Sequence, residues 1–510
     1  MTKPVIHIGN VRSKIVADKK TIKLLTDYLK VENDFWARKA TEFRMPKYKS
    51  YITPKGRFNT GLLNRVARVL KFHDVEYDIE DHREKIPVPP VEQIKSALKL
   101  SKYKPRPYQL EAIITGLENP FGIIKSATGT GKSVMMGFLL IAWNLKSIIL
   151  VKDIGLARQL REEFAKILGV RTNEIGFIGG GEFNQKRVTI GMVQSINSRS
   201  AKKLAKIKDY LKTVEAVFVD ECHNAQANNY QNALTWLENA YVRLSFTATN
   251  ETSLFKTEED GKNQDDLLLE AWLGPVIFDL PLIEMIEEGY LCKPEVYFVE
   301  NELYFDGNPL DYVNEYERII VNDEERNRVA CKVAHHCFKN GGNVVLFIDR
   351  LAHGENIIEM LVNEFRIPPD KIAYVHGDDT RLSKEKRRSL LADFKAFKIP
   401  IIIGTVLNEG IDFNCDAAVN LAGGESPRKT IQRLGRILRK MKDENGKIDL
   451  ESDEIAVLFD FKDIGHVFFQ PHGESRRKTF EKERRGHPDG EELIKIKSLT
   501  MEEFDDYLTR

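Results

Sequence analysis

Cysteine is scarce in this chain, and long apolar runs are absent from it. No run of about 18 uncharged apolar residues occurs, so we expect no membrane-spanning helix and no membrane partner. The first residues lack the apolar stretch and cleavage site of a signal peptide. The cysteines form no CxxC pair, which argues against a disulfide framework and a zinc site and favours the reducing cytoplasm. They are Cys222, Cys292, Cys331, Cys337 and Cys415.

Positive charge is unevenly distributed along the chain, although the net charge is only +1. Residues 1–90 are rich in Lys and Arg, and between Arg38 and Lys71 the only acidic residue is Glu42. Such a segment binds nucleic-acid phosphates or forms a solvated surface, and we favour nucleic acid. Its aromatic residues would stack on unpaired bases or build a small core, and we favour the core. The candidate DNA contacts are Arg44, Lys47, Lys49, Lys55 and Arg57, and the candidate stacking residues are Tyr48 and Phe58.

Residues 1–90 are expected to form a small basic α+β domain that is separated from the rest by a linker. The proline-rich residues 87–90 can continue neither helix nor sheet, so the linker is placed there. Apolar periodicity predicts the elements of the domain. They are helices near 24–29 and 62–70, a hairpin over 49–58 and a strand over 75–79.

Beyond the linker, short apolar strands alternate with helical segments in two successive series. This pattern predicts an α/β fold with two tandem parallel-sheet domains, each covered by helices on both faces. We place the first domain at 91–280 and the second at 281–460, followed by a charged, mostly helical C-terminal extension at 461–510 with no strand pattern. The expected strands are 122–125, 147–151, 174–178, 188–191, 216–219 and 243–246, then 295–299, 344–348, 371–375, 401–404, 417–421 and 455–459.

A glycine-rich segment, residues 126–133, lies between an expected strand and an expected helix. Its glycines allow backbone N–H groups to surround phosphates at a helix N-terminus. Lys132 would reach the β- and γ-phosphates of ATP, and the Ser133 hydroxyl would bind Mg²⁺. The first position, usually Gly or Ala, is Ser126, which is also compact. The predicted ATP-binding residues of this loop are Thr128, Gly129, Thr130, Gly131, Lys132 and Ser133.

The apolar strand expected at 216–219 ends in two acidic residues, Asp220 and Glu221. Ligands of α/β proteins bind at the carboxyl ends of the strands, where Asp220 would lie. Asp220 would hold Mg²⁺ directly or through water, and Glu221 would orient and deprotonate the attacking water. Because this pair follows a phosphate-binding loop in the same α/β series, it indicates ATP hydrolysis rather than a chance pair of exposed acids.

Residues 432–439 place Arg436 and Arg439 three positions apart on an expected helix, so that the two side chains share a face. This arrangement suits arginine fingers that a second lobe directs at a nucleotide held by the first. Alone, the segment would indicate a solvated basic helix. With the two preceding motifs, it predicts two lobes that close on ATP and separate after hydrolysis, as a motor requires.

The motifs, in this order, resemble those of superfamily 2 helicases over residues 105–440, with the Asp-Glu-x-His form of the acidic motif. The resemblance implies two RecA-like domains that use ATP and Mg²⁺. It also implies roles for single residues. Arg106 and Gln109 match an adenine-reading motif, and Gly410 and Asp412 match a nucleotide-binding motif of the second lobe. Gln432 belongs to the same motif as Arg436 and Arg439, and the resemblance implies that it takes part in catalysis with them. The implied nucleic-acid contacts are Gln194, Ser195, His376 and Thr405.

Residues 273–291 resemble the segment between the two lobes in one group of helicases. This group includes relatives of the repair helicase of transcription initiation and the restriction-enzyme translocases. The whole chain is similar to phage recombination helicases. This similarity implies remodelling of branched DNA, through fork regression, branch migration and removal of RNA from R-loops, in recombination, repair and replication. The expected partners are branched DNA, single-strand junctions, RNA–DNA hybrids and recombination or single-strand-binding proteins, in the host cytoplasm if the chain is phage-encoded. An RNA helicase and a restriction-type motor subunit remain alternatives.

Two further clusters are weaker. Arg476 and its basic neighbours up to Arg485 interleave with acidic residues, so an ion-paired helix is as good an interpretation as a DNA contact. The Cys331, Cys337, His335 and His336 group lacks the spacing of a metal site and is interpreted as helix packing.

Overall fold

The computed structural model describes residues 3–32, 48–87, 104–248, 264–302, 311–376, 384–405, 407, 413–441 and 448–509. The chain divides into two compact units. The first comprises Met1–Ser126 and Thr130–Leu280, and the second comprises Ala127–Gly129 and Pro281–Arg510. Across the described ranges, no helix combines the length and the apolar character that crossing a membrane would need.

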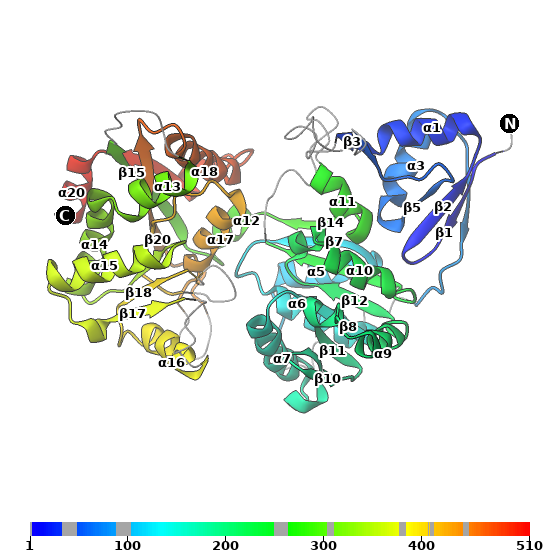
Figure 1. The fold of residues 1–510 in the computed structure, drawn as a ribbon, viewed down its shortest axis with the longest axis horizontal. Helices are drawn as coiled ribbons and strands as arrows, with labels where there is room; N and C mark the ends of the chain where they lie inside the picture. The colour runs from blue at the N-terminus through cyan, green and yellow to red at the C-terminus, as the bar shows by residue number, and fades with distance from the viewer. Residues whose placement is uncertain are drawn as a thin grey trace. The chain divides into compact units, whose positions relative to one another are not determined.

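The described part of the N-terminal module of the first unit contains a four-stranded sheet, a separate two-stranded sheet and two α-helices (Figure 1). Helices α1 (Lys19–Tyr28) and α3 (Leu63–Phe72) pack their apolar sides on one face of the four-stranded sheet. Alternate residues of β1 and β2 are therefore buried. Leu267 and Ala271 of α11 (Gln264–Leu273) belong to the same apolar core, so the module packs directly on the following α/β domain. The strands of the four-stranded sheet, in the order β5-β2-β1-β6, are β5 (Arg57–Asn59), β2 (Arg12–Val16), β1 (Val5–Ile8) and β6 (Asp78–Asp81).

Two local predictions in this module hold over only part of their length. The turn expected near 54–56 exists, and Gly56 has φ +74° there. The hairpin around this turn is present but short, since Ile52 and Phe58 form an antiparallel bridge and the Thr53 amide donates to the Arg57 carbonyl at 2.8 Å. Farther from the turn, β5 pairs with β2, and β4 (Tyr48–Ser50) pairs with β3 (Lys30–Glu32). The strand expected from 75 begins at Asp78, because the Val75 amide donates to the Leu70 carbonyl and so closes the end of α3.

The larger sheet of the first unit has eight strands in the order β10-β9-β11-β8-β12-β13-β7-β14. All pairs are parallel except β9 with β10. In β8, Ile149 and Val151 pack among α5, α6 and α7, whereas Ile148 and Leu150 pack among α9, α10 and α11, so helices cover both faces. The strands are β7 (Phe121–Ser126), β8 (Ser147–Val151), β9 (Gly176–Gly179), β10 (Glu182–Asn184), β11 (Val188–Met192), β12 (Ala216–Val219), β13 (Val242–Thr247) and β14 (Val276–Leu280), and the helices are α5 (Pro107–Glu118), α6 (Lys132–Trp143), α7 (Ile154–Leu168), α9 (Ala201–Leu211) and α10 (Asn228–Trp236).

The second unit contains a seven-stranded sheet in the order β17-β18-β16-β19-β20-β15-β21, and all its pairs are parallel. One face packs on α14, α15 and α20. On the other, Phe298 of β15 contacts Phe480 of α18. The predicted α/β fold with two tandem parallel-sheet domains is therefore confirmed. The elements are β15 (Lys293–Glu302), β16 (Val344–Phe347), β17 (Ile372–Val375), β18 (Ile401–Gly404), β19 (Ala417–Asn420), β20 (Ile455–Ile464), α14 (Glu324–Lys339), α15 (Leu351–Asn363), α17 (Pro427–Ile437), α18 (Phe469–Glu483) and α20 (Met501–Thr509).

The expectation that residues 461–510 contain no strand is wrong. Strand β21 (Lys495–Leu499) pairs in parallel with β15 and forms an edge of the second sheet. Its alternation is short, and Lys495 and Lys497 interrupt the apolar pattern. Lysine is common on edge strands, where it discourages pairing with other chains. The segment therefore resembles a charged helix in sequence while completing the sheet in the structure.

Arg476 of α18, one residue of the basic C-terminal cluster, is buried and has a structural role. Its guanidinium donates to Asp460 Oδ1 at 2.9 Å and to the carbonyls of Phe461 and Gly424 at 3.0 and 2.9 Å. Arg476 and Asp460 are both almost fully inaccessible to solvent. Arg476 therefore pairs with the sheet and not with the acidic residues of its own helix, and it joins α18 to the sheet. The expected ion pair within the helix is formed by Arg477 and Glu481, at 3.0 Å.

Replacing Arg476 by Met is expected to lower the free energy of unfolding of the second unit by about 3–5 kcal/mol, because Asp460 would stay buried without its cation. Urea unfolding followed by circular dichroism measures this loss. Arg477→Met is the matched control, since Arg477 lies on the same helix, is about one-third exposed and pairs with Glu481. Equal losses in the two variants would contradict the assignment.

Candidate functional site

The glycine-rich loop joins β7 to α6 in the first unit. Gly129 and Gly131 have φ +89° and +82°, a backbone region that side-chain-bearing residues rarely adopt. Lys132 is the first residue of the 12-residue helix α6. The Thr130 hydroxyl donates to the Ser126 hydroxyl at 3.1 Å, so the serine at the first loop position stabilises the turn. The loop thus opens onto a helix N-terminus, which favours a phosphate ligand.

The residues expected to read adenine lie beside this loop. Gln109, near the start of α5, donates from Nε2 to the Thr130 carbonyl at 2.7 Å, and its Oε1 accepts from the Arg106 amide at 2.9 Å. Tyr108 also donates to the Thr130 carbonyl, at 3.1 Å. These bonds fix the position of Gln109 beside the loop. A contact with the base stays a prediction.

The acidic pair follows β12, at the carboxyl end of the sheet. Lys132 Nζ lies 4.0 Å from Glu221 Oε1, and His223 Nδ1 lies 3.3 Å from Glu221 Oε2. The Glu221 amide donates to Asp220 Oδ1 at 3.0 Å. Glu221 has φ +49°, which is costly for a residue with a side chain, and such strain often occurs at functional sites. The turn directs Glu221 toward Lys132 and His223.

The Asp220 carboxyl group lies in a buried environment next to another carboxylate. Burial, followed by the nearby Glu221 carboxylate, raises the pKa of Asp220 to about 7, although Lys132 opposes the shift. Two carboxylates facing one lysine leave a negative charge that a divalent cation would neutralise. Ser133 and Asp220 carry oxygen donors of the kind that Mg²⁺ prefers, and their joint binding of the ion stays a prediction.

In the second unit, α17 carries the predicted arginine motif. Gln432 and Arg436 lie on this helix and are both buried. The helix ends at Ile437, so the prediction that Arg439 shares a helical face with Arg436 is wrong. Beyond the helix, the chain pairs with the segment before β15, where Arg439 bridges Leu291. Backbone pairing replaces the last helical turn that the sequence pattern suggested.

The predicted nucleic-acid contacts are scattered over several elements. Gln194 is exposed and Ser195 half-buried on α8 (Val193–Ile196), directly after β11. His376 follows β17 and Thr405 follows β18, and the Thr405 amide donates to the Val375 carbonyl at 3.3 Å, so the two strand ends lie together. The predicted nucleotide contacts Gly410 and Asp412 and the predicted DNA contacts Arg44 and Lys47 lie outside the described residues.

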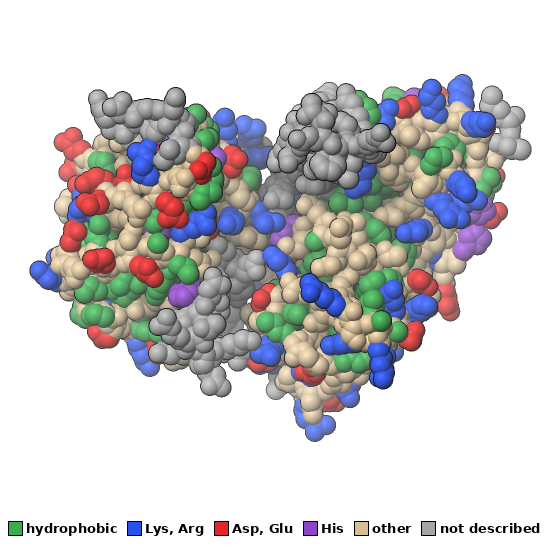
Figure 2. Space-filling model, in the orientation of Figure 1, with side chains coloured by type: hydrophobic (Ala, Val, Ile, Leu, Met, Phe, Trp, Pro, Cys, Tyr) green, Lys and Arg blue, Asp and Glu red, His purple; other side chains and the backbone are tan. Residues whose placement is uncertain are grey.

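The basic residues of the N-terminal module are exposed, as a DNA contact requires. Lys49 lies on β4, Lys55 in the turn and Arg57 on β5, and Figure 2 shows blue basic side chains spread over this module. Phe58 is 3% exposed and belongs to the module core, as the core interpretation expects. Tyr48 is 47% exposed, and Lys30 Nζ lies 5.5 Å from the centre of its ring, so stacking of Tyr48 on a base stays a prediction.

Two features of the site were not foreseen. His223 of the acidic motif contacts the carboxylate of Glu221, which the motif alone does not indicate. Arg433 donates to Asn420 Oδ1 at 2.6 Å and to Asp349 Oδ1 at 2.8 Å, which anchors α17 to the ends of β16 and β19. The partners of Arg433 are distant in sequence, so no local pattern indicates them.

Two regions of the chain match models of known protein families. Residues 102–252 match the model of the type III restriction enzyme res subunit, and residues 325–441 match the helicase conserved C-terminal domain. The chain carries the two motor domains of a superfamily 2 helicase. It is therefore an ATP-hydrolysing enzyme of the helicase class, as the motifs predict.

The chain is similar to several named helicases at low identity. It is 25% identical over 415 residues to the DNA 3'-5' translocase XPB2 of Sulfurisphaera tokodaii, covering 73% of this chain and 87% of that protein. It is 23% identical over 362 residues to the ATP-dependent DNA helicase uvsW of Enterobacteria phage T4, covering 66% of each chain. The expected resemblance to a phage helicase is confirmed. A human protein described as a probable ATP-dependent RNA helicase, DDX23, is 23% identical over 70% of this chain.

Solved structures share the fold. The helicase MrfA bound to DNA gives a TM-score of 0.55 at 14% identity, over 78% of this chain and 55% of that one. Dbp5 of S. cerevisiae, bound to RNA and ADP BeF3, gives 0.53 at 16% identity, over 82% of this chain and 95% of that one. These likenesses support the RecA-like fold of the two parallel-sheet domains.

Proposed function

We propose that this chain is an ATP-driven DNA translocase that remodels branched DNA. The observation that carries the proposal is the convergence of Lys132, Glu221 and buried Asp220 at the phosphate-binding loop. That arrangement supports ATP hydrolysis, and the exposed basic residues of the N-terminal module support a second contact with DNA. The preference for DNA rests on the relatives, of which the Sulfurisphaera protein is named a DNA translocase and the phage T4 protein a DNA helicase.

In this proposal each residue of the ATP site has one task. Lys132 holds the β- and γ-phosphates, and Ser133 with Asp220 holds Mg²⁺, which would neutralise the charge that develops during phosphoryl transfer. Glu221 orients the attacking water and accepts its proton, and His223 keeps the Glu221 carboxylate in place. Gln432, Arg436 and Arg439 of the second unit act on the nucleotide when the lobes close, which couples hydrolysis to movement.

We further propose that DNA contacts are made mainly to the phosphate backbone. Ser195 and Thr405 hydroxyls, with Gln194 and His376, bind phosphates without reading sequence, as a translocating motor requires. Branched substrates would engage the N-terminal module in addition. The proposal includes fork regression, branch migration, R-loop removal and recombination partners, and the similarity to a phage T4 protein named a DNA helicase supports action on DNA.

A branch-migration assay tests the proposal. The chain is incubated with ATP and Mg²⁺ on a four-way junction with homologous arms, and the release of two duplexes is followed on gels. Lys132→Ala serves as the inactive control. Release of duplexes by the wild-type chain alone supports the proposal. ATP-dependent opening of RNA duplexes with no effect on the junction would replace it by an RNA-helicase function.

The triple substitution of Lys49, Lys55 and Arg57 by Ala is expected to weaken junction binding by about tenfold at 100 mM salt, because contacts with DNA phosphates are lost. Each lost contact should also reduce the slope of log K against log[salt] by about one. Fluorescence anisotropy across a salt series measures both effects. The control removes the same charge from α1 of the same module, at Lys19, Lys20 and Lys23, which are exposed. Equal weakening in both variants would contradict the placement of the contact.

A further inference from the structure

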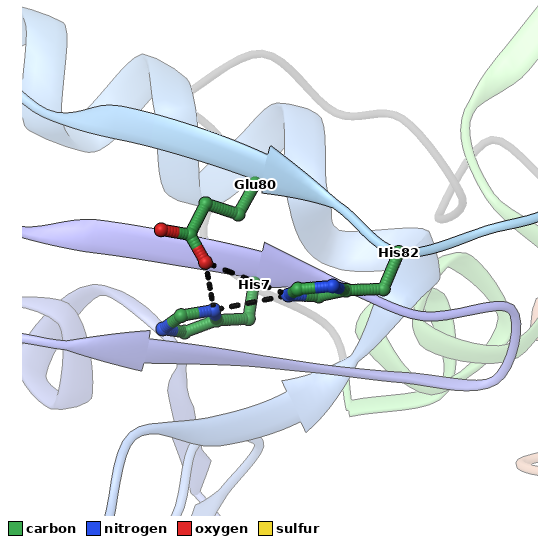
Figure 3. A group of neighbouring side chains, drawn as sticks. All are labelled: His7, Glu80 and His82. Atoms are coloured by element: carbon green, nitrogen blue, oxygen red, sulfur yellow. Dashed lines mark hydrogen bonds and ion pairs between the residues drawn. The ribbon is translucent and has the colours of Figure 1, made fainter.

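We propose that His7, Glu80 and His82 form a binding site for a transition metal ion such as Zn²⁺ on the N-terminal module (Figure 3). The three side chains bring two imidazole nitrogens and one carboxylate oxygen to a common point. This site is separate from the ATP site and does not depend on the proposed motor function.

Strand register brings the three residues together. Strand β1 pairs in parallel with β6, and His7 lies directly opposite Glu80. His82 follows Glu80 by two positions, just beyond the end of β6, so the two side chains lie on the same side of the chain. The ligand set therefore joins two strands that are more than 70 residues apart in sequence.

The distances match those between the ligands of a tetrahedral metal. His7 Nδ1 lies 2.9 Å from Glu80 Oε2 and 3.1 Å from His82 Nε2, and His82 Nε2 lies 3.6 Å from the same carboxylate oxygen. Zinc bonds of about 2.0–2.1 Å in a tetrahedron place neighbouring ligand atoms about 3.3 Å apart. A zinc ion thus fits within the triangle with small side-chain adjustments.

Hydrogen bonds among the three groups explain their positions less fully than a bound metal ion does. A neutral imidazole carries one N–H, so a hydrogen on His7 Nδ1 can be directed at Glu80 or at His82 but not fully at both. A metal ion would instead satisfy both nitrogens and the carboxylate oxygen at once. Two nitrogens and one oxygen suit Zn²⁺, Ni²⁺ or Cu²⁺, whereas Mg²⁺ and Ca²⁺ prefer oxygen ligands.

A second cluster in the described ranges, Glu287, His487 and Asp489, provides a contrast. His487 Nε2 pairs with Glu287 Oε2 at 3.0 Å, and His487 Nδ1 accepts the Asp489 amide at 3.3 Å. Both ring nitrogens of His487 thus have partners within the protein. This cluster therefore does not offer a metal ion two imidazole nitrogens and a carboxylate oxygen, as His7, Glu80 and His82 do. It supplies a matched histidine control.

Metal binding would reinforce the junction between the module and the domain that follows it. Arg83, next to His82, pairs with Asp81 and lies over the Tyr241 ring at 5.4 Å. Asn10, shortly after β1, donates to the Glu238 carbonyl at 3.1 Å. A metal ion that joins β1 to the end of β6 would therefore hold both contacts in place, and it would stabilise the folded module by mass action.

Co²⁺ titration of the untagged, chelator-treated full chain tests the site. We expect one Co²⁺ per chain, with the visible absorption of a tetrahedral nitrogen–oxygen complex, no thiolate charge-transfer band, and displacement by Zn²⁺ in the presence of Mg²⁺. His7→Gln and His82→Gln are each expected to weaken binding at least about tenfold, because each removes one of three protein ligands. These variants should fold normally, since His7 and His82 are 34% and 60% exposed.

His487→Gln and the ATPase-defective Lys132→Ala are expected to bind Co²⁺ as the wild-type chain does. Zn²⁺ should also raise the unfolding temperature of the wild-type chain and leave that of His7→Gln/His82→Gln unchanged. The proposal is overturned if the wild-type chain and this double variant bind Co²⁺ equally, or if neither binds it at micromolar concentration.

Discussion

Replacing Lys132 by Ala is expected to lower the rate of ATP hydrolysis by about 10²–10³-fold, the loss typical when one preorganised group that stabilises transition-state charge is removed. Lys132 lies beside Glu221 and opposes the pKa shift of Asp220, so it provides positive charge where the phosphates would bind. DNA binding should persist, because the proposed DNA contacts lie on other elements. Phosphate release and anisotropy with labelled DNA measure the two properties.

A surface lysine of the same unit provides the control for this experiment. Lys166 in the last turn of α7 is exposed and distant in sequence from the loop, so Lys166→Ala should hydrolyse ATP at the wild-type rate. Hydrolysis by Lys132→Ala within a few-fold of the control would contradict the assignment of residues 126–133 to the nucleotide.

Asp220→Asn is expected to abolish hydrolysis while making the chain more stable above pH 7. The folded-state pKa of Asp220, about 7, lies above its usual value of 3.8. Between these two values the folded chain retains a proton that the unfolded chain has released, so stability falls as pH rises through this window. Above pH 7 the ionised, buried carboxylate carries its full cost. Asparagine has a similar shape and does not ionise.

Thermal unfolding of both proteins at pH 5 and pH 8 measures this effect. We expect the Asp220→Asn variant to unfold at a higher temperature at pH 8, by about 2–4 °C for each kcal/mol relieved. The difference should shrink at pH 5, where the wild-type carboxyl group is protonated. A variant that is less stable than the wild-type chain at pH 8 would show that the Asp220 carboxylate is not destabilising.

Loss of activity and gain of stability in the same variant would indicate that the site is strained for function. The Glu221 backbone, with φ +49°, is a second cost at the same turn. Both features lie where the phosphate-binding loop and the acidic strand end meet, as expected when charge is held ready for a ligand rather than neutralised within the protein.

Much of the fold follows from sequence because apolar strands in parallel sheets are short, continuous and bounded by helices. The expected strands 147–151, 216–219 and 401–404 coincide with β8, β12 and β18. The loop and acidic motif are also local patterns, so the position of Lys132 at the start of a helix and of Asp220 after a strand could be predicted.

What the sequence could not provide depends on contacts between distant segments. Strand β21 is recognisable only from its pairing with β15, and the end of α17 before Arg439 depends on pairing with Leu291. The strained turn at Glu221 and its contact with His223 need three-dimensional geometry. Cysteine spacing argued against a zinc site, but it says nothing of one built from His7, Glu80 and His82, which only the pairing of β1 with β6 brings together.

The central claim, a motor that acts on branched DNA, is tested most directly by ATP hydrolysis in the presence of different nucleic acids. Purified chain is assayed with single-stranded DNA, a four-way DNA junction and RNA of matched length, with Lys132→Ala as the background. The proposal predicts the strongest stimulation by the junction and none in the Lys132 variant. Stimulation by RNA alone would contradict the DNA assignment while leaving the ATP-driven motor in place.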